Sequence, residues 1–378
     1  MDLAAYLTDL AYLTNIDSGT TDGHAGIAET CDFFEARFRA LGWHTERHSP
    51  SPLIGENLVC TWGDPERCDL LMIGHLDTVF SCGTAAARPF RIEGNLAYGP
   101  GVADMKNGAL LMYYLALGFS AEVLEKLNIV MVFNADEETG SVHSRKVYEK
   151  YAKCARYAFI YECATTDGAC CSARKGGLGY TVQFGGKAGH CGYAFTNGAK
   201  SAVHEMGRWI YFLTEMQNKE LGTSVNIGVA KGGTKGNVVA DRAEMTIDIR
   251  FLENSERARF EDAIEELKKG ARERGIEVSM QGRCKLAWEN DDSQLAYLAH
   301  VSEICRSAGV PFSHRMRGGL SDANIIAQYG AICLDGLAPM GDHCHTDEEC
   351  MFIDTVERFY ALSCLLIRDL AESISVSA

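Results

Sequence analysis

The chain has 378 residues, of which 47% are hydrophobic and 23% charged, and its formal net charge is −15. This length accommodates two or three domains, and the composition is that of a globular protein. An acidic surface repels nucleic acid and anionic membranes, so we expect neither as a partner. No apolar run approaches the ~18 residues that a membrane span needs, so we also expect no transmembrane segment.

The cysteines and the first residues of the chain indicate a compartment. Fifteen cysteines are present, an odd number, and no CxxC pair or Cys/His zinc spacing occurs among them. Residues 1–6 carry neither a basic stretch nor a long apolar stretch, so we expect no secretory signal. The sequence therefore predicts a reducing, cytoplasmic setting with mostly buried free thiols.

The first half of the chain alternates strand and helix patterns. Apolar positions at helical spacing and short apolar runs predict four helices and four strands there. The helices are expected at 3–14, 27–41, 107–117 and 142–152, and the strands at 57–62, 69–73, 127–133 and 157–161. Strands that alternate with helices imply an α/β fold with a mainly parallel sheet covered on both sides.

The pattern changes after about residue 173. Strands are expected at 176–184, 224–230, 243–251 and 276–281, with helices at 199–214 and 256–274. This β-α-β-β-α-β order is the ferredoxin-like pattern and predicts an inserted α+β domain at 177–288. Helix–strand alternation then resumes, with helices at 293–308, 325–327 and 355–371 and a strand at 331–334. We therefore expect residues 1–176 and 289–378 to form one domain around the insertion.

The most informative stretch is GHLDTV, residues 74–79, which directly follows the buried strand 69–73. His75 lies where that strand ends, and ligands of open α/β sheets bind at the carboxyl ends of the strands. Asp77 projects to the same side while the backbone stays extended. An imidazole beside a carboxylate is the usual composition of a metal ligand and its orienting partner. The alternative is a surface histidine and a loop aspartate.

Two further acidic segments occupy similar positions. Asp104 lies in a glycine-rich loop just before a predicted helix, where an aspartate also serves as an N-cap. Asp136, Glu137 and Glu138 directly follow the strand 127–133. Consecutive acids repel one another unless a cation lies between them, although a helix N-terminus also favours acids. One such acid can bind a metal while its neighbour stays free as a base.

The remaining candidates are Glu162, which closes the strand 157–161, and two histidines in a loop before the last helix. His343 and His345 are two residues apart, and position alone leaves both open as ligands. Mixed imidazole and carboxylate ligands suit Zn²⁺, with Mn²⁺ or Co²⁺ possible. A carboxylate shared by two metals gives the spacing used in two-metal hydrolysis.

These motifs resemble those of a known family. The set is GHLDTV, GPGVADMKNG, NADEETGS, a glutamate 24 residues after Glu138, GKAGH, NVV…DIR, GGLSDAN and HTDEE. In this order and over nearly the whole chain, it resembles the M20 family of zinc peptidases and deacylases, and within it the glutamate carboxypeptidase branch of the carboxypeptidase G2 type.

The resemblance implies roles for the candidate residues. Asp104 is expected to bridge two zinc ions. His75 and Glu162 would complete one site, and Glu138 and His345 the other. It further implies that Asp77 orients His75, that Glu137 is the general base, and that the peptide bond between Asp104 and Met105 is cis.

The resemblance also assigns the two domains. Residues 1–176 and 289–378 would form a catalytic domain of the zinc-exopeptidase type, and 177–288 a lid through which two copies dimerise. His190 of the lid would reach the partner subunit's site and stabilise the oxyanion of the intermediate. Asn237 and Arg250 match lid residues associated with substrate carboxylates, although a structural ion pair is the alternative for Arg250. Arg317, before two glycines, is a further candidate for bidentate carboxylate binding.

We therefore expect a cytoplasmic, homodimeric, two-zinc hydrolase of amide bonds that releases a C-terminal amino acid from small peptides or N-acyl amino acids. The alternative is an N-acyl amino acid deacylase of the acetylornithine or succinyl-diaminopimelate type, which needs the same metals and base. A non-catalytic binding protein would be expected to lack Glu137 or a ligand. The chain departs from the family pattern at Cys163, where proline is usual, and at His343 and Cys344, where glycine or an aromatic residue is common.

Overall fold

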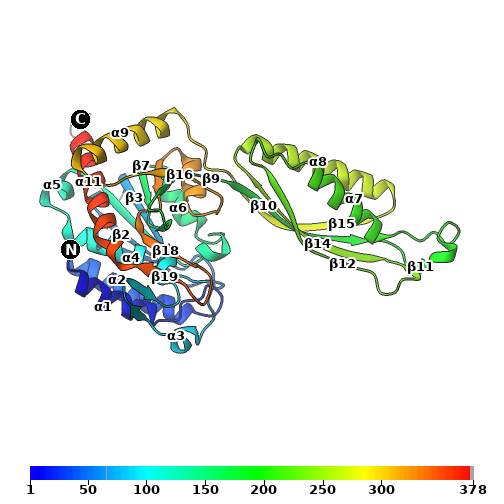
Figure 1. Ribbon diagram of the computed structural model, residues 1–378, viewed down its shortest axis with the longest axis horizontal. Coiled ribbons are helices and arrows are strands. Elements are labelled where there is room, and N and C mark those ends of the chain that lie inside the picture. The colour runs from blue at the N-terminus through cyan, green and yellow to red at the C-terminus, as the bar shows by residue number, and fades with distance from the viewer. Residues whose placement is uncertain (65, 375–378) are drawn as a thin grey trace. The chain divides into compact units, whose positions relative to one another are not determined.

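The computed structural model describes residues 1–64 and 66–374. They fold into two compact units (Figure 1). The first comprises residues 1–172, 290–317 and those from 321 onward, and the second comprises Ala173–Glu289 and Gly318–Leu320. None of the described helices combines the length and the apolar composition that a membrane crossing requires.

The first unit is built on an eight-stranded sheet of order β1-β2-β6-β3-β7-β17-β9-β16. Its central strands run parallel to one another, and they are β6 (Ile129–Asn134), β3 (Cys68–His75), β7 (Ala155–Ile160) and β17 (Ile332–Asp335). The flanking strands are β1 (His44–His48), β2 (Asn57–Trp62), β9 (Cys170–Arg174) and β16 (His314–Arg317). The parallel centre of the sheet confirms the predicted α/β class.

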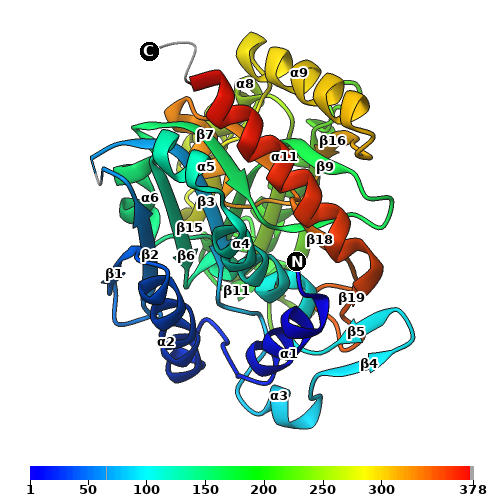
Figure 2. The ribbon, with the colours of Figure 1, turned by 90° about the vertical axis from the view of Figure 1, so that its left-hand side faces the viewer.

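Helices cover both faces of this sheet, as Figure 2 shows. On β3, Leu70 and Met72 belong to the large apolar core, while the equally buried Leu71 and Ile73 alternate with them and point to the other face. The core side holds α1 (Leu3–Thr14), α2 (His24–Ala40), α4 (Asn107–Gly118), α5 (Ala121–Lys126), α9 (Asp292–Ala308) and α11 (Val356–Ile374). The other side holds α6 (Arg145–Ala152) and α10 (Ala323–Ile326), which contact β3 and β7.

A second, smaller sheet of the first unit joins segments that are far apart in the sequence. Its order is β4 (Arg91–Glu93), β5 (Leu96–Tyr98), β19 (Cys350–Phe352), β18 (Ala338–Asp342) and β8 (Cys163–Ala164). Strand β8 runs parallel to β18. This pairing brings Glu162, just before β8, close to the loop that follows β18 and carries His345. The short α3 (Thr84–Ala87) lies outside both sheets.

The second unit is an antiparallel sheet of order β12-β14-β10-β15 with two helices packed on one face. Its strands are β10 (Gly176–Gly185), β12 (Ser224–Gly232), β14 (Arg242–Phe251) and β15 (Glu277–Lys285), and its helices are α7 (Ala202–Glu215) and α8 (Asn254–Glu273). On β14 every second residue is buried, because one face meets the helices and the other does not. Chain order and strand order together are those of the predicted ferredoxin-like pattern. A two-stranded ribbon, β11 (Gly189–His190) with β13 (Val238–Val239), extends it.

Candidate functional site

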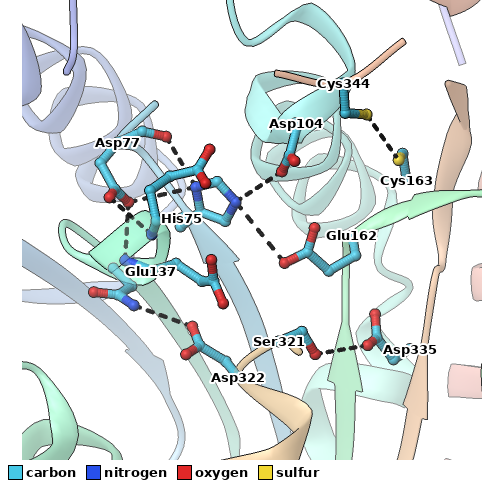
Figure 3. A network of polar contacts seen from close by, with 12 residues as sticks. His75, Asp77, Asp104, Glu137, Glu162, Cys163, Ser321, Asp322, Asp335 and Cys344 are labelled. Atoms are coloured by element: carbon cyan, nitrogen blue, oxygen red, sulfur yellow. Dashed lines mark hydrogen bonds and ion pairs between the residues drawn. The ribbon is translucent and has the colours of Figure 1, made fainter. Parts of the chain in front are cut away.

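The candidate residues of the first unit gather at the carboxyl ends of its parallel strands, the edge where open α/β sheets bind ligands. His75 is the last residue of β3. Glu137 and Glu138 form the 3-10 turn that follows β6, and Glu162 follows β7. Figure 3 shows His75, Glu137 and Glu162 with Asp104 around one small volume.

Asp104 stands at the centre of two groups of possible ligands. Its Oδ1 lies 3.0 Å from His75 Nε2, which is itself 3.8 Å from Glu162 Oε1. Its Oδ2 lies 3.1 Å from His345 Nε2, which is 3.2 Å from Glu138 Oε2. The ligand atoms of each group lie within 4.8 Å of one another. The structure thus brings together all five residues for which metal binding was expected.

Of the two loop histidines, the structure brings His345 to the cluster. His343 is exposed, and its Nε2 lies 3.8 Å from Asp342 Oδ2. Both histidines have positive φ, 56° and 67°, so the loop turns sharply at each of them. The two side chains are about equally exposed but have different partners, since only His345 lies beside Asp104 and Glu138.

Asp77 contacts the imidazole of His75 through its backbone oxygen and through its carboxylate. His75 Nδ1 lies 2.9 Å from the backbone oxygen of Asp77 and 3.4 Å from its carboxylate. The carboxylate also accepts from Thr20 Oγ1 at 2.6 Å and from the backbone N–H groups of Glu137 and Glu138 at 3.1 and 3.2 Å. Asp77 therefore ties the end of β3 to the acidic turn, and both its backbone oxygen and its carboxylate lie beside Nδ1 of the imidazole.

The three consecutive acids have three different surroundings. Asp136 is fully buried and accepts hydrogen bonds from Ser144 Oγ and from the backbone N–H of His143. Glu138 faces His345. Glu137 extends toward the interior of the cluster (Figure 3), and its charge contributes to raising the pKa of Glu162. The three neighbouring acids therefore differ in their contacts: Asp136 is bonded within the fold, Glu138 faces a histidine of the cluster, and Glu137 extends into the cluster.

Two acids that sequence reasoning missed hold the loops of the site. The buried carboxylate of Glu349 accepts the backbone N–H groups of Gly101, Ala103 and Asp104 at 2.8–3.0 Å. The peptide bond between Asp104 and Met105 is cis, as the resemblance implied. The only available signal for Glu349 was its place in the acidic run after His345, where nothing distinguishes the buried acid from the exposed ones.

Asp322 is the second of these acids, and it supports the turn after β6. It is 2% exposed and accepts hydrogen bonds from Asn134 Nδ2 at 3.0 Å, from Ser141 Oγ and from Tyr148 OH. Asn134 ends β6 and Ser141 follows the acidic turn, so one carboxylate holds both ends of the segment that carries the candidate base. The motif GGLSDAN contains Asp322, but nothing in that motif indicates these partners.

The pKa shifts in the cluster indicate that its carboxylates are stabilised by positive charge close to them. Burial opposes the ionisation of Asp104, but hydrogen bonds from His345 and His75 outweigh it and lower the pKa of Asp104. The same contact with Asp104, together with Glu138, raises the pKa of His345 to about 11. Burial, with the charge of Asp104, raises the pKa of Glu162 well above its ordinary value, and burial also raises that of Glu138. Carboxylates this close are stable as anions only with cations among them.

The residues present fit two divalent cations. Each group offers one imidazole nitrogen and carboxylate oxygens, the donors that zinc takes in hydrolytic sites. Glu138 Oε1 is buried and lacks a hydrogen-bond partner among the described residues. Buried polar atoms are rarely left without a partner, and a cation between Glu138 and Asp104 would supply one.

The remaining candidates are divided between the units. His190, Asn237 and Arg250 belong to the second unit. His190 is exposed, its Nδ1 accepts the N–H of Gly192 at 3.1 Å, and Cys191 N–H donates to the backbone oxygen of Asn237. Arg250 forms the ion pair that was its alternative, with its Nε and Nη2 on Asp248 at 2.6 and 2.8 Å.

Arg317 belongs to the first unit, at the end of β16. Its Nη1 donates to the backbone oxygen of Cys163 at 2.9 Å. Its Nε and Nη2 are buried without a hydrogen-bond partner in the described part of the chain. Because Cys163 directly follows Glu162, a guanidinium edge with unused donors lies next to a segment that carries one of the candidate ligands.

Comparison with known proteins gives consistent results. A family model described as a peptidase dimerisation domain, the M20 type, matches residues 172–274. Carboxypeptidase G2 from Pseudomonas sp. (strain RS-16) is 30% identical over 97% of this chain and 89% of its own. Acetylornithine deacetylase from Myxococcus xanthus is 28% identical over 68% of this chain and 70% of its own.

Solved structures share the fold. A tripeptidase from Staphylococcus aureus superposes with a TM-score of 0.80 at 20% identity, covering 98% of this chain and 99% of that one. An M20 family metallo-carboxypeptidase from Sulfolobus solfataricus superposes with a TM-score of 0.70 at 15% identity, covering all of both chains.

Proposed function

The chain belongs to the M20 family of metal-dependent peptidases and amidohydrolases, and on that premise we propose that it is a two-zinc carboxypeptidase. It would hydrolyse the amide bond that joins a C-terminal amino acid to a small peptide or to an N-acyl group. The single observation that carries this proposal is the position of Asp104 between two groups that each contain one histidine and one glutamate.

The metal ligands in this proposal are His75 and Glu162 for one ion, Glu138 and His345 for the other, and Asp104 for both. When bound, the two zinc ions polarise the scissile carbonyl and lower the pKa of the attacking water. Co²⁺ or Mn²⁺ would suit the same donors.

The chain's own residues then position and move the proton. Glu137 takes it from the attacking water and passes it to the leaving amine. Its backbone N–H is held by Asp77, and the strand end that carries Asp77 also fixes the ring of His75. A geometry fixed in this way before substrate binds requires little rearrangement during the reaction.

Arg317 is the candidate in the first unit for binding the carboxylate of the substrate. Two of its guanidinium nitrogens lie along one edge and lack partners. A carboxylate can accept from both of them at once. In this proposal the C-terminal carboxylate of the substrate takes that place. Arg317→Gln should then raise KM at least tenfold for peptides and acyl-glutamates, whereas Arg315→Gln, on the exposed part of β16, should leave KM unchanged.

The second unit would act as a lid and a dimerisation surface. The matched dimerisation-domain model supports a homodimer. Strand β12 is an edge strand, and Tyr211 and Phe212 of α7 are exposed, as suits an interface between copies.

Within that dimer, His190 would serve the partner's site. Because its Nδ1 accepts a hydrogen bond, the neutral ring carries its proton on Nε2, the atom that would donate to an oxyanion. Asn237 and Arg250 would contact the substrate carboxylate, for which Arg250 must exchange its bond with Asp248. We place the enzyme in the cytoplasm, which its fifteen free cysteines support.

The variant Glu137→Gln tests the assignment of the base. It should retain two zinc ions per chain and lose at least a hundredfold in kcat, because it keeps the shape of the side chain without its basicity. The matched control Glu149→Gln, on the exposed side of α6, should keep full activity. Unchanged hydrolysis by the Glu137→Gln protein would rule out this mechanism.

A further inference from the structure

Two thiols from distant parts of the chain lie side by side next to the candidate metal-binding residues. The Sγ atoms of Cys163 and Cys344, which are 181 residues apart in sequence, are 3.8 Å apart (Figure 3). Both side chains are half-buried. The pairing of β8 with β18 holds their segments together, since Cys163 begins β8 and Cys344 lies two residues after β18.

Each thiol is the direct neighbour of a candidate metal ligand, and the two ligands belong to different groups. Cys163 follows Glu162, and Cys344 precedes His345. A covalent bond between the two sulfur atoms would therefore connect the segments that carry one ligand of each ion. Neither sulfur atom belongs to the two groups of candidate ligands, so neither cysteine is a metal ligand in the proposed site.

The two segments differ in how easily they can move. Cys163 lies in a strand, and its backbone oxygen accepts a hydrogen bond from Arg317. Cys344 lies in a turn whose residues from 345 to 348 are exposed, between two non-glycine residues with positive φ. Such backbone conformations are less favourable than the usual ones for these residues. The turn, rather than the strand, would give way if the sulfur atoms were drawn together.

We propose that Cys163 and Cys344 are a modification site, at which a hydroperoxide closes a disulfide that withdraws His345 from the metal cluster. A disulfide has an S–S distance of about 2.0 Å, so the sulfur atoms must approach by about 1.8 Å from their present 3.8 Å. Because His345 is adjacent to Cys344, the imidazole moves with the turn.

The reaction needs no partner beyond the peroxide. The sulfur of one cysteine attacks a peroxide oxygen, the O–O bond breaks, and a sulfenic acid and one water form. The second thiol then attacks that sulfur, the S–O bond breaks, and a second water leaves as the S–S bond forms. Two thiols lose two electrons and two protons in total, and hydrogen peroxide is reduced to two molecules of water.

The first test detects the disulfide without any substrate. The full-length protein is treated with hydrogen peroxide, digested without reduction and analysed by mass spectrometry. We expect one cross-linked peptide pair joining Cys163 to Cys344, lighter by two hydrogen atoms, that a dithiol reductant separates. The same pair should form in the triple variant Cys82→Ser, Cys154→Ser, Cys191→Ser, which removes the exposed cysteines. Separate oxidation of the two residues, or their linkage to other cysteines, would overturn the proposal.

The second test measures the consequence for metal binding, and this part rests on the proposed function. Equilibrium dialysis should show that oxidation weakens the binding of one zinc ion per chain at least tenfold, and that reduction restores it. The variant Cys344→Ser should bind zinc equally before and after peroxide. Formation of the cross-link with unchanged zinc affinity would overturn the proposed withdrawal of His345.

A failure of the proposed function and a failure of the proposed disulfide give different results. Reduced wild-type protein that binds no zinc would contradict the proposed function but leave the cross-link in place. If the serine variant does not fold, a trivalent arsenical, which bridges two close thiols, replaces it on the wild-type chain. It should protect Cys163 and Cys344 together from alkylation. Alkylation of both despite the arsenical would overturn the close pairing.

Discussion

Replacing Asp322 by asparagine should both destabilise the first unit and lower catalysis. One carboxylate there serves three buried donors, with Oδ2 accepting from Asn134 and Tyr148 and Oδ1 from Ser141. Asparagine keeps one oxygen and turns an NH₂ group toward the remaining donor. The loss of one charge-assisted hydrogen bond and the weakening of the other two should lower the free energy of unfolding by about 2–4 kcal/mol. Because Asn134 and Ser141 bracket the acidic turn, kcat should fall while KM changes little.

Urea unfolding of the zinc-loaded protein, together with steady-state kinetics, measures both effects. The variant Tyr148→Phe removes one donor and leaves the carboxylate, so its cost should be smaller, about 1–2 kcal/mol. The control Asp292→Asn, at an exposed position of α9, should lie within about 0.5 kcal/mol of wild type. A cost below about 1 kcal/mol for Asp322→Asn, or an equal cost for Tyr148→Phe, would refute the view that this carboxylate organises the turn.

Two further predictions concern the second metal ion and the second unit. His345→Ala should reduce bound zinc, measured by atomic emission, from two ions per chain to one, while the matched variant His343→Ala keeps both; equal zinc contents would contradict the ligand assignment. Burial alone would raise the pKa of Glu205, but hydrogen bonds from Arg274 outweigh it and lower that pKa. The pair therefore stabilises the second unit above about pH 4.3, the ordinary value for glutamate, and loses its effect as the pH falls through the lowered pKa. Glu205→Gln should cost about 1–2 kcal/mol at pH 7 by thermal unfolding and less at pH 3, and Glu265→Gln, in an exposed pair, close to nothing. A cost that grows toward low pH would contradict this account of the pair.

The sequence predicted the centre of the fold well because that centre is defined by local patterns. Apolar runs such as 69–73 and 157–161 favour buried strands, and a polar residue directly after such a strand lies at the edge of the sheet. The positions of His75 and Glu162 follow from this rule, whereas Asp104 was found from its glycine-rich loop before a helix. The alternation of apolar and polar residues along β14 likewise predicted which face of the sheet in the second unit is buried.

The parts that sequence reasoning missed depend on contacts between distant segments. Strands β5 and β19 have three residues each and exist because they pair with each other across the chain. Helix α6 begins at Arg145 rather than near 142, since Ser141 and Ser144 use their hydroxyl groups on Asp322 and Asp136. No local pattern carries such partners.

The sequence also does not show how the side chains of one motif divide their roles. An acidic run does not show which carboxylate is buried, and Glu349 became visible only through its three backbone donors. The same holds for Asp77, whose carboxylate also accepts from the backbone N–H groups of Glu137 and Glu138.

The central claim is that this centre uses bound metal to release a C-terminal amino acid. The most direct measurement is hydrolysis by zinc-loaded protein of N-acyl-glutamates, dipeptides, N-acetylornithine and N-succinyl-diaminopimelate, each with and without a chelator. The account predicts turnover of the peptides or acyl-glutamates that stops when the chelator is added and returns with zinc. Turnover that persists with the metal removed, or that is confined to N-acetylornithine or the succinyl substrate, would contradict it.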